Sequence, residues 1–303
     1  MIAFACPILD TESYRRYAEP GIRLAAEADS ELYALAPAGG LARSYNLLLE
    51  RAAGHEDLEA LVLVHPHAEI TDPLFCRKAR AALRDPDVGV VGAVGATGVR
   101  NIAWWEGEVR TGDVRHRYTE YGGGELDAFA WTQPKRAPGE VECVDGLLLV
   151  LSPSVARNIR FDEGLILSLA SHGFDFDFCA QVRAAGYKVA VADFELTQHR
   201  ALELLDEDRL WVEAHIRLGE KWEGRLPGVP APETDWKARA RRAEAEREAA
   251  RAFAHATLLD ADARVLAAER ALEEVTSNAS WRGTAPLRWL NKQRAERRSR
   301  ASA

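Results

Sequence analysis

The sequence predicts an α/β protein whose doubly wound, mostly parallel sheet carries helices on both faces and is followed by a C-terminal helical extension. Three observations support this fold class. Short apolar runs alternate with helical patterns through residue 222, and the connections between them are short. From residue 235 the composition shifts to Ala, Arg and Glu. Strands that alternate with helices pair in parallel, because each helix returns the chain across the sheet.

The first half of the chain repeats a strand-helix pattern. Its apolar runs are nearly continuous, which is typical of strands buried on both faces. Strands are expected at residues 2–9, 31–37, 60–64 and 88–95. Helices are expected at residues 12–29 (broken near Pro20-Gly21), 41–54 (ended by Gly54) and 72–86 (with Asp72 as N-cap and Pro73 in the first turn).

The second half is less regular. Residues 98–140 hold glycines, charges and aromatic residues, and they predict no long helix. A long irregular segment inside a domain is usually functional or disordered. Regular elements return as a strand at 146–152, a helix at 175–187 that Gly186 closes, and a strand at 188–193.

We expect three units along the chain. Residues 1–232 form the α/β domain, residues 233–276 an amphipathic helix and residues 277–303 a basic tail. Aliphatic residues recur at seven-residue spacing between 258 and 272, which favours a short coiled coil and permits a homo-oligomer. The tail carries tryptophans among arginines, so one interpretation is peripheral contact with an anionic membrane. The alternatives are that the tail docks on the domain or stays solvated.

Composition excludes several classes of protein. A net charge of -8 and a pI near 5.6 argue against a nucleic-acid binder. No apolar run approaches the roughly 20 residues that span a bilayer, and no basic leader precedes the first strand. We therefore expect a cytoplasmic protein, peripheral at the inner face of the membrane if the tail binds there. The four scattered cysteines show no CxxC spacing and are expected to be structural.

The stretch LVLVHPHAEI, residues 61–70, ends an apolar run at two histidines. In open α/β sheets, ligands bind beyond the carboxyl ends of the strands. If the strand continues, His65 and His67 face the same way, and imidazole suits manganese or zinc better than magnesium. The structural alternative is that His65 caps the strand and His67 faces solvent.

The stretch SHGFDFDFCAQVRAAGYKV places Asp175 and Asp177 among phenylalanines at the start of a helix. One explanation is structural, since carboxylates at a helix N-terminus are favoured by the helix dipole. The other is catalytic. A carboxylate that is partly desolvated by aromatic rings holds its proton more tightly, which suits a general base.

The order of VHPHAEI, VDGLLLVLS, HGFDFDFCAQVRAAGYKVAVAD and TQHR resembles the family 2 glycosyltransferases of GT-A fold, most of all the streptomycin-biosynthesis-type branch. The resemblance covers about residues 1–222. LARSYN resembles the early helix in which such enzymes carry an Asn near the nucleotide. The tail segment SNASWRGTAPLRWL is similar to a Ser-Trp-Arg-x-Thr-x-Pro-Leu-Arg motif often attached to bacterial glycosyltransferases.

The resemblance implies an inverting, hexosyltransferase-type enzyme of polysaccharide biosynthesis, with a nucleotide-sugar donor and a glycan or lipid-linked glycan as acceptor. The implied catalytic base is Asp175. The implied donor-binding residues are Cys6, Pro7, Asn46, His65, Asp145 and Gly146, and the implied metal ligands are His65, His67 and His199. Aromatic faces stack on sugars, so the candidate acceptor-binding residues are Trp104 and Trp105, with His172 and Asp177 from the loop and helix of the base.

The sequence departs from the family at its metal-binding DxD motif, which is His65-Pro66-His67 here. A divalent ion stabilises the leaving diphosphate, but magnesium prefers oxygen ligands. We therefore expect manganese rather than magnesium, with zinc as the other candidate. Two alternatives stay open. Protonated histidines or an arginine replace the metal, or catalysis is lost and the protein is a non-catalytic nucleotide-sugar or glycan-binding protein.

Overall fold

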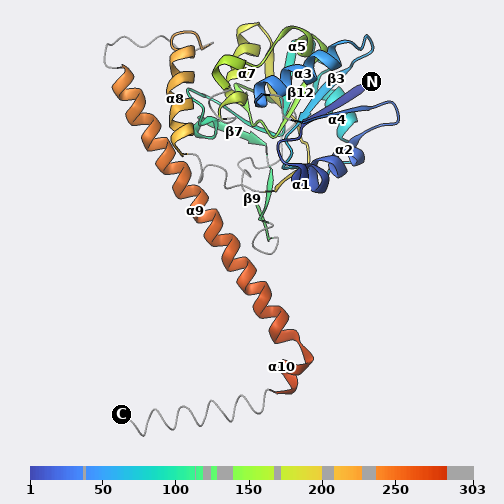
Figure 1. Ribbon diagram of the computed structural model, residues 1–303, viewed down its shortest axis with the longest axis vertical. Helices are drawn as coiled ribbons and strands as arrows, with labels where there is room; N and C mark the ends of the chain where they lie inside the picture. Colours follow the sequence, from blue (N-terminus) through green and yellow to red (C-terminus); the bar gives the residue numbers. More distant parts are fainter. Residues whose placement is uncertain are drawn as a thin grey trace.

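The computed structural model describes residues 1–36, 39–112, 114–118, 124–127, 139–166, 172–199, 208–226 and 237–284. An α/β domain precedes one long helix, α9 (Lys237–Ser277), which extends well past it (Figure 1). A seven-stranded, mostly parallel sheet with helices packed against it forms the domain. The predicted fold class, with its C-terminal helical extension, is confirmed.

The large sheet has five strands in one direction and two in the other. In spatial order they are β10 (Gly139–Val141), β13 (Lys188–Val191), β5 (Val88–Gly92), β12 (Leu148–Leu151), β3 (Ala60–Val64), β1 (Ile2–Pro7) and β2 (Glu31–Leu35). The antiparallel strands are β10 and β12. β12 lies between β3 and β5 and is antiparallel to both, at the centre of a sheet that the sequence predicted to be mostly parallel. Its burial on both faces makes its apolar run look like that of a parallel strand, so its direction is not visible in the pattern.

The predicted strand 88–95 is in fact two strands. β5 ends at Gly92, and β6 (Val94–Thr97) joins a separate sheet with β11 (Cys143–Val144) and β7 (Val109–Gly112). Residues on both sides of Ala93 are buried, so hydrophobicity does not mark the bend. A third sheet has the order β4 (Ala68–Ile70), β14 (Leu196–His199), β8 (Arg115–Tyr118) and β9 (Gly124–Asp127). The irregular segment 98–140 therefore supplies strands to both small sheets.

The helices have shorter bounds than the patterns predicted. They are α1 (Thr11–Ser13), the π-helical segment η1 (Tyr14–Ala18), α2 (Glu19–Ala25), α3 (Leu41–Ala53), α4 (Phe75–Ala82), the 3₁₀ turn η2 (Trp104–Glu106), α5 (Pro153–Asn158), α6 (Glu163–Ile166), α7 (Phe174–Ala184), α8 (Asp208–Trp222), α9 and α10 (Ala279–Gly283). The break predicted near Pro20 does not occur. Pro20 stands in the first turn of α2, where the winding changes from π to α and a missing N–H costs least.

Asp72 was predicted to cap the helix that follows it, but α4 begins three residues later. The Asp72 carboxylate accepts a hydrogen bond from the Leu74 N–H (2.9 Å) and pairs with Lys78 (2.6 Å). Its side chain is almost completely buried. The local turn satisfies the carboxylate before the helix starts, which moves the N-cap to Leu74.

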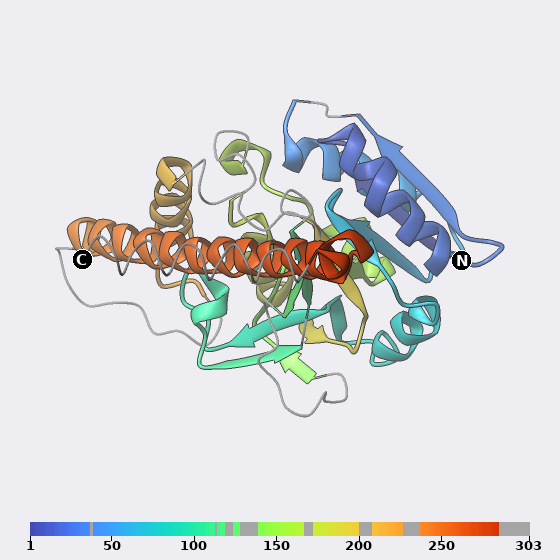
Figure 2. The same ribbon diagram turned by 90° about the horizontal axis from the view of Figure 1, so that it is seen from below.

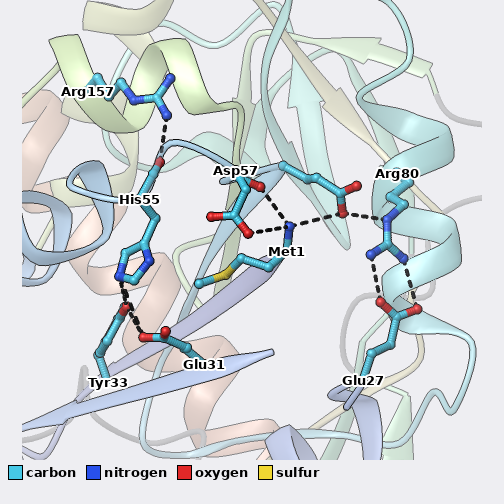
Figure 3. Close-up of polar contacts among 9 residues, drawn as sticks. Met1, Glu27, Glu31, Tyr33, His55, Asp57, Arg80 and Arg157 are labelled. Carbon is cyan, nitrogen blue, oxygen red and sulfur yellow. Dashed lines mark hydrogen bonds and ion pairs between the residues drawn. The ribbon is translucent and has the colours of Figure 1, made fainter. Parts of the chain in front are cut away.

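Charged and polar side chains join the loops at the amino end of β1 (Figure 3). Arg80 of α4 donates to both carboxylate oxygens of Glu27 (2.8 and 2.7 Å) and to Glu59 (2.7 Å). The Tyr33 hydroxyl of β2 lies 2.6 Å from Nε2 of His55. The side chains of Arg80, Glu27 and Glu59 are 36%, 41% and 47% exposed, so we expect their ion pairs to contribute little to stability. They lie at the amino ends of the parallel strands, away from the edge where a ligand is expected.

All four cysteines are free and buried, in agreement with their predicted structural role. Within the described residues, no helix combines the length and hydrophobicity needed to cross a bilayer. Trp281 in α10 is exposed. The rest of the predicted basic tail, residues 285–303, lies outside the described residues, and so do residues 233–236 at the start of the predicted helical unit.

Candidate functional site

A pocket of about 730 Å³, partly open to solvent, lies where the carboxyl end of β3 meets the amino end of α7. The lining residues are His65, Ile102, Trp104, Trp105, Asp145, Gly146, Leu147, His172, Gly173, Phe174, Asp175, Gln198 and Trp211. Seven of these are predicted site residues: His65, Trp104, Trp105, Asp145, Gly146, His172 and Asp175.

A turn at residues 145–147 connects the end of β3, which carries His65, to the start of α7, which carries Asp175. The His65 N–H donates to the Leu147 carbonyl (2.9 Å), which extends the pairing of β3 with β12 by one residue. The Gly146 N–H donates to Oδ2 of Asp175 (3.2 Å), and Asp145 Oδ1 accepts from the Leu147 N–H (2.8 Å). The predicted histidine and the predicted base, far apart in the chain, are therefore attached to neighbouring residues of one turn.

Two glycines allow this close assembly. A Cβ on Gly146 would lie 2.2 Å from Cζ of Phe174, so only glycine lets that ring cover the turn. Gly173 precedes α7 with φ at +72°, a left-handed conformation that favours glycine. A Cβ there would lie 2.5 Å from Leu218 and 2.8 Å from Ile102. The first turn of α7 is thereby held against the pocket.

The environment of Asp175 suits a general base. The side chain lies in the first turn of α7, where the Phe176 N–H donates to its Oδ1 (2.8 Å). Burial nevertheless raises the pKa of Asp175 to about 6, because it outweighs the stabilisation of the charge by the N–H groups of Phe176 and Gly146. A carboxylate with a pKa near 6 is ionised at neutral pH and still accepts a proton readily.

The hydrogen bond from the His67 N–H to Nδ1 of His65 (3.3 Å) indicates which tautomer His65 adopts. Nδ1 is the acceptor, so a neutral ring carries its proton on Nε2. His65 lines the pocket. It can therefore offer an N–H donor to an anionic ligand.

Three tryptophans form the apolar wall of the pocket. Trp104 and Trp105 meet edge to face with ring centroids 5.9 Å apart, and Trp105 lies 6.4 Å from Trp211 of α8. Trp104 is 1% exposed and Trp211 is 2% exposed, so both belong to the core. Trp105 is only half-buried, and it is the tryptophan best placed to stack on a sugar ring.

Three predicted donor-binding residues, Cys6, Pro7 and Asn46, do not line this pocket. Cys6 is fully buried, and burial raises the pKa of its thiol. The side-chain amide of Asn46 donates to the Phe161 carbonyl (2.9 Å) and accepts from the Phe161 N–H (2.9 Å). These bonds give Asn46 a structural role in holding the segment before α6. The donor-binding role predicted for the three residues stays a prediction.

Asp177, predicted to bind the acceptor, also lies outside the pocket lining. Its carboxylate is completely buried and accepts hydrogen bonds from Trp222 Nε1 (2.8 Å), Gln181 Nε2 (2.9 Å) and Lys221 Nζ (2.9 Å). Trp222 and Lys221 belong to α8, so Asp177 joins α7 to α8. Contact with an acceptor would require breaking these bonds.

The rings of His65 and His67 lie close together, with centroids 5.1 Å apart, but among the described residues they do not form a three-ligand group with His199. Nε2 of His199 lies 2.6 Å from Glu69 Oε2, and its ring stacks on Tyr17 with centroids 3.7 Å apart. His67 is nearly buried, with Nε2 3.9 Å from Asp10 Oδ2. In the part of the chain that the structure describes, no three His, Cys, Asp or Glu side chains are grouped to hold a metal ion. The residues at hand do not fit the predicted three-histidine site.

Local backbone geometry explains this result. Residues 65–67 form a turn in which the Ala68 N–H donates to the His65 carbonyl (2.9 Å), so the two histidines do not follow the alternation of a strand. In β14 the alternation does hold: Gln198 lines the pocket, and its neighbour His199 faces the other way. Gln198 and Trp211 are pocket residues that the sequence predictions missed. The alternation within TQHR was the available signal for Gln198.

Residues 6–214 match the model of a glycosyltransferase-like family. The chain belongs to this family. This glycosyltransferase-like protein is 28% identical over 203 residues to the streptomycin biosynthesis protein StrF of Streptomyces griseus. That alignment covers 66% of this chain and 66% of StrF, so the chain spans slightly less than two thirds of that relative.

Solved structures show weaker likeness. The mannosyltransferase PcManGT from Pyrobaculum calidifontis, in complex with GDP-Man and Mn²⁺, is 14% identical with a TM-score of 0.43, over 93% of this chain and 82% of that chain. GalNAc-T7 with UDP, GalNAc and Mn²⁺ is 10% identical with a TM-score of 0.41, over 67% of this chain and 43% of that chain.

Proposed function

We propose that this glycosyltransferase-like protein is an inverting enzyme that moves a hexosyl group from a nucleotide-sugar to a hydroxyl of a glycan or lipid-linked glycan. One observation carries the proposal. Asp175, whose pKa burial raises to about 6, lines the same pocket as His65 and hydrogen-bonds the turn to which His65 is attached. A base, an N–H donor and an aromatic wall therefore belong to one pocket.

In the proposed mechanism Asp175 takes the proton of the acceptor hydroxyl as its oxygen attacks the anomeric carbon of the donor. The bond to the nucleoside diphosphate breaks on the opposite face of the sugar, and the configuration inverts. The Nε2–H of His65 donates to the departing diphosphate and stabilises the charge that develops there. Asp145 accepts from donor-sugar hydroxyls, while Trp105 and His172 contact the acceptor.

A bound divalent ion would offset the charge of the diphosphate. The described side chains do not supply three ligands for one, so no step above depends on it. Manganese, ahead of magnesium, remains our prediction for metal dependence. It is checked by donor hydrolysis in MnCl₂, MgCl₂ and EDTA, and a rate unaffected by EDTA contradicts it.

His65→Ala is expected to weaken nucleoside diphosphate binding by about 10-fold or more, because a hydrogen bond to a charged group contributes about 1.5–3 kcal/mol. Isothermal titration with UDP, GDP and dTDP measures the affinity. The matched control is His55→Ala, which removes a histidine at the opposite edge of the domain, outside the pocket. Equal affinity of the two variants would exclude His65 from the donor site.

A non-catalytic nucleotide-sugar or glycan-binding protein is the second candidate, favoured by the histidines that replace DxD and do not assemble a metal site. Incubation with UDP-, GDP- and dTDP-sugars, with and without manganese, separates the two functions. Donor binding without turnover in every condition supports the binding protein. Release of a nucleoside diphosphate in any condition supports the enzyme.

We propose that residues 1–232 form the transfer domain, residues 233–276 a helical unit and residues 277–303 a basic tail. A cytoplasmic protein whose basic tail rests on the inner face of the membrane would bring the pocket near a lipid-linked acceptor. Sedimentation with anionic vesicles, with and without residues 285–303, tests this placement. Equal sedimentation of both forms contradicts it.

A further inference from the structure

The second half of α9 exposes a regular row of apolar residues. Leu258 is 65% exposed, Val265 57%, Leu272 62% and Val275 49%. Three alanines, also exposed, complete the row. We call this row the seam; its members are Ala254, Leu258, Ala261, Val265, Ala268, Leu272 and Val275. Their spacing alternates between four and three residues over three heptads, which is the pattern of a coiled coil with Leu258, Val265 and Leu272 at a and the others at d.

The seam faces away from the domain. Ala252, Ala256 and Ala263 of α9 are buried, and each precedes a seam residue by two positions. Two residues turn an α-helix by about 200°, so the buried alanines and the seam lie on opposite sides. The C-terminal half of α9 also runs beyond the domain (Figure 1), and in the view from below α9 lies in front of the domain (Figure 2). A second helix can therefore approach the seam without displacing the domain.

We propose that the seam is the interface of a homodimer, in which α9 pairs with α9 of a second copy as a parallel, in-register coiled coil. Charge specifies this arrangement. Arg264 occupies the g position directly before Val265, and Glu269 occupies the e position directly after Ala268. In a parallel coiled coil, each g residue lies beside the e residue of the next heptad on the second helix. Each Arg264 therefore lies beside Glu269 of the second copy. In an antiparallel pair, e positions face e positions. Asp262 and Glu269 of one copy would then lie beside the same acidic residues of the second copy and repel them.

The composition around the seam favours a second copy over a membrane. Residues 258–275 contain five acidic and two basic residues. Helices that lie on anionic membranes instead carry Lys and Arg on their polar face. Alanine at three of the four d positions buries little apolar area, so the dimer forms reversibly and depends on concentration.

The first test is the mass of the full chain by sedimentation equilibrium from about 1 to 100 µM, since a reversible dimer responds to concentration. We expect the mass to rise from 33.5 kDa toward twice that value. Val265→Asp is expected to remain a monomer. Phe253→Asp, at an exposed apolar position outside the seam, is expected to dimerise like the unchanged protein. Circular dichroism checks that both variants keep their helix content. A monomer at every concentration, or a Val265→Asp dimer, overturns the proposal.

The second test addresses orientation. Arg264→Glu and Glu269→Arg are each expected to raise the dissociation constant several-fold, and the double variant is expected to restore it. Leu258→Cys is expected to form an oxidised dimer, because equivalent a residues face each other in a parallel pair and the four native cysteines are buried. If the double variant does not restore the dissociation constant and Leu258→Cys forms no oxidised dimer, the parallel arrangement is overturned. Vesicle binding by a monomer, abolished by Val265→Asp, would instead assign the seam to a membrane and overturn the dimer.

Discussion

Asp175→Asn is expected to lower the turnover number by about 10²–10⁴-fold, the usual contribution of a general base. Affinity for the donor nucleotide should stay nearly unchanged, because the substitution preserves the shape of the side chain and exchanges one carboxylate oxygen for an NH2 group, which cannot accept a proton. Rates of nucleoside diphosphate release and titration of the nucleotide measure the two effects. The matched control is Asp29→Asn at an exposed position, which should leave both unchanged.

The pH dependence of the same residue provides a second readout. Burial raises the pKa of Asp175 from its usual 3.8 to about 6, so kcat/KM should rise with pH through about 6 as the base loses its proton. Below that pH the protonated carboxyl cannot act as a base. The rising limb should be absent from the residual activity of Asp175→Asn.

The raised pKa also has a consequence for stability. Between about pH 4 and 6 the folded protein holds a proton that the unfolded chain has released, so this group makes the free energy of unfolding fall as pH rises through that window. Above pH 6 the buried charge destabilises the fold by up to about 3 kcal/mol. Asp175→Asn should therefore be as stable as the unchanged protein near pH 4 and more stable at pH 7. Full turnover in this variant, or lower stability at pH 7, would contradict the assigned base and its environment.

Asp177→Ala is expected to lower the free energy of unfolding by about 3–5 kcal/mol, the usual cost of removing one partner from a buried ion pair. The completely buried carboxylate binds Lys221 and Trp222 of α8. Its loss leaves the indole N–H of Trp222 in the interior without its acceptor, and leaves Lys221 with Asp162 as its remaining described carboxylate partner. Urea unfolding followed by circular dichroism measures the change.

Asp162→Asn is the matched control, because the Asp162 carboxylate pairs with the same Lys221 (2.8 Å) from a side chain that is 36% exposed. An exposed pair contributes only about 0–1 kcal/mol. Because α8 also carries Trp211 of the pocket wall, the Asp177 variant should lose acceptor affinity together with stability. Equal, small losses in the two variants would show that Asp177 does not join α7 to α8 as described.

The sequence was sufficient to predict the fold class and the position of the pocket along the chain. The sequence placed His65 at the carboxyl end of β3, where ligands bind in such sheets, and the resemblance to family 2 glycosyltransferases implied that Asp175 at the start of α7 serves the same site. Both line one pocket. The sequence could not predict that β12 would enter the sheet against the direction of its neighbours, because a strand buried on both faces looks alike in either direction.

Residue types, their periodicity and the family resemblance together indicated the candidate side chains at the rim of the sheet. Tertiary structure decided which of them face the pocket. His199 pairs with Glu69, Asn46 with Phe161 and Asp177 with α8, and each of these partners is remote in sequence. A polar side chain satisfied by a buried partner is withdrawn from a ligand, and that choice depends on contacts that form only when the chain has folded.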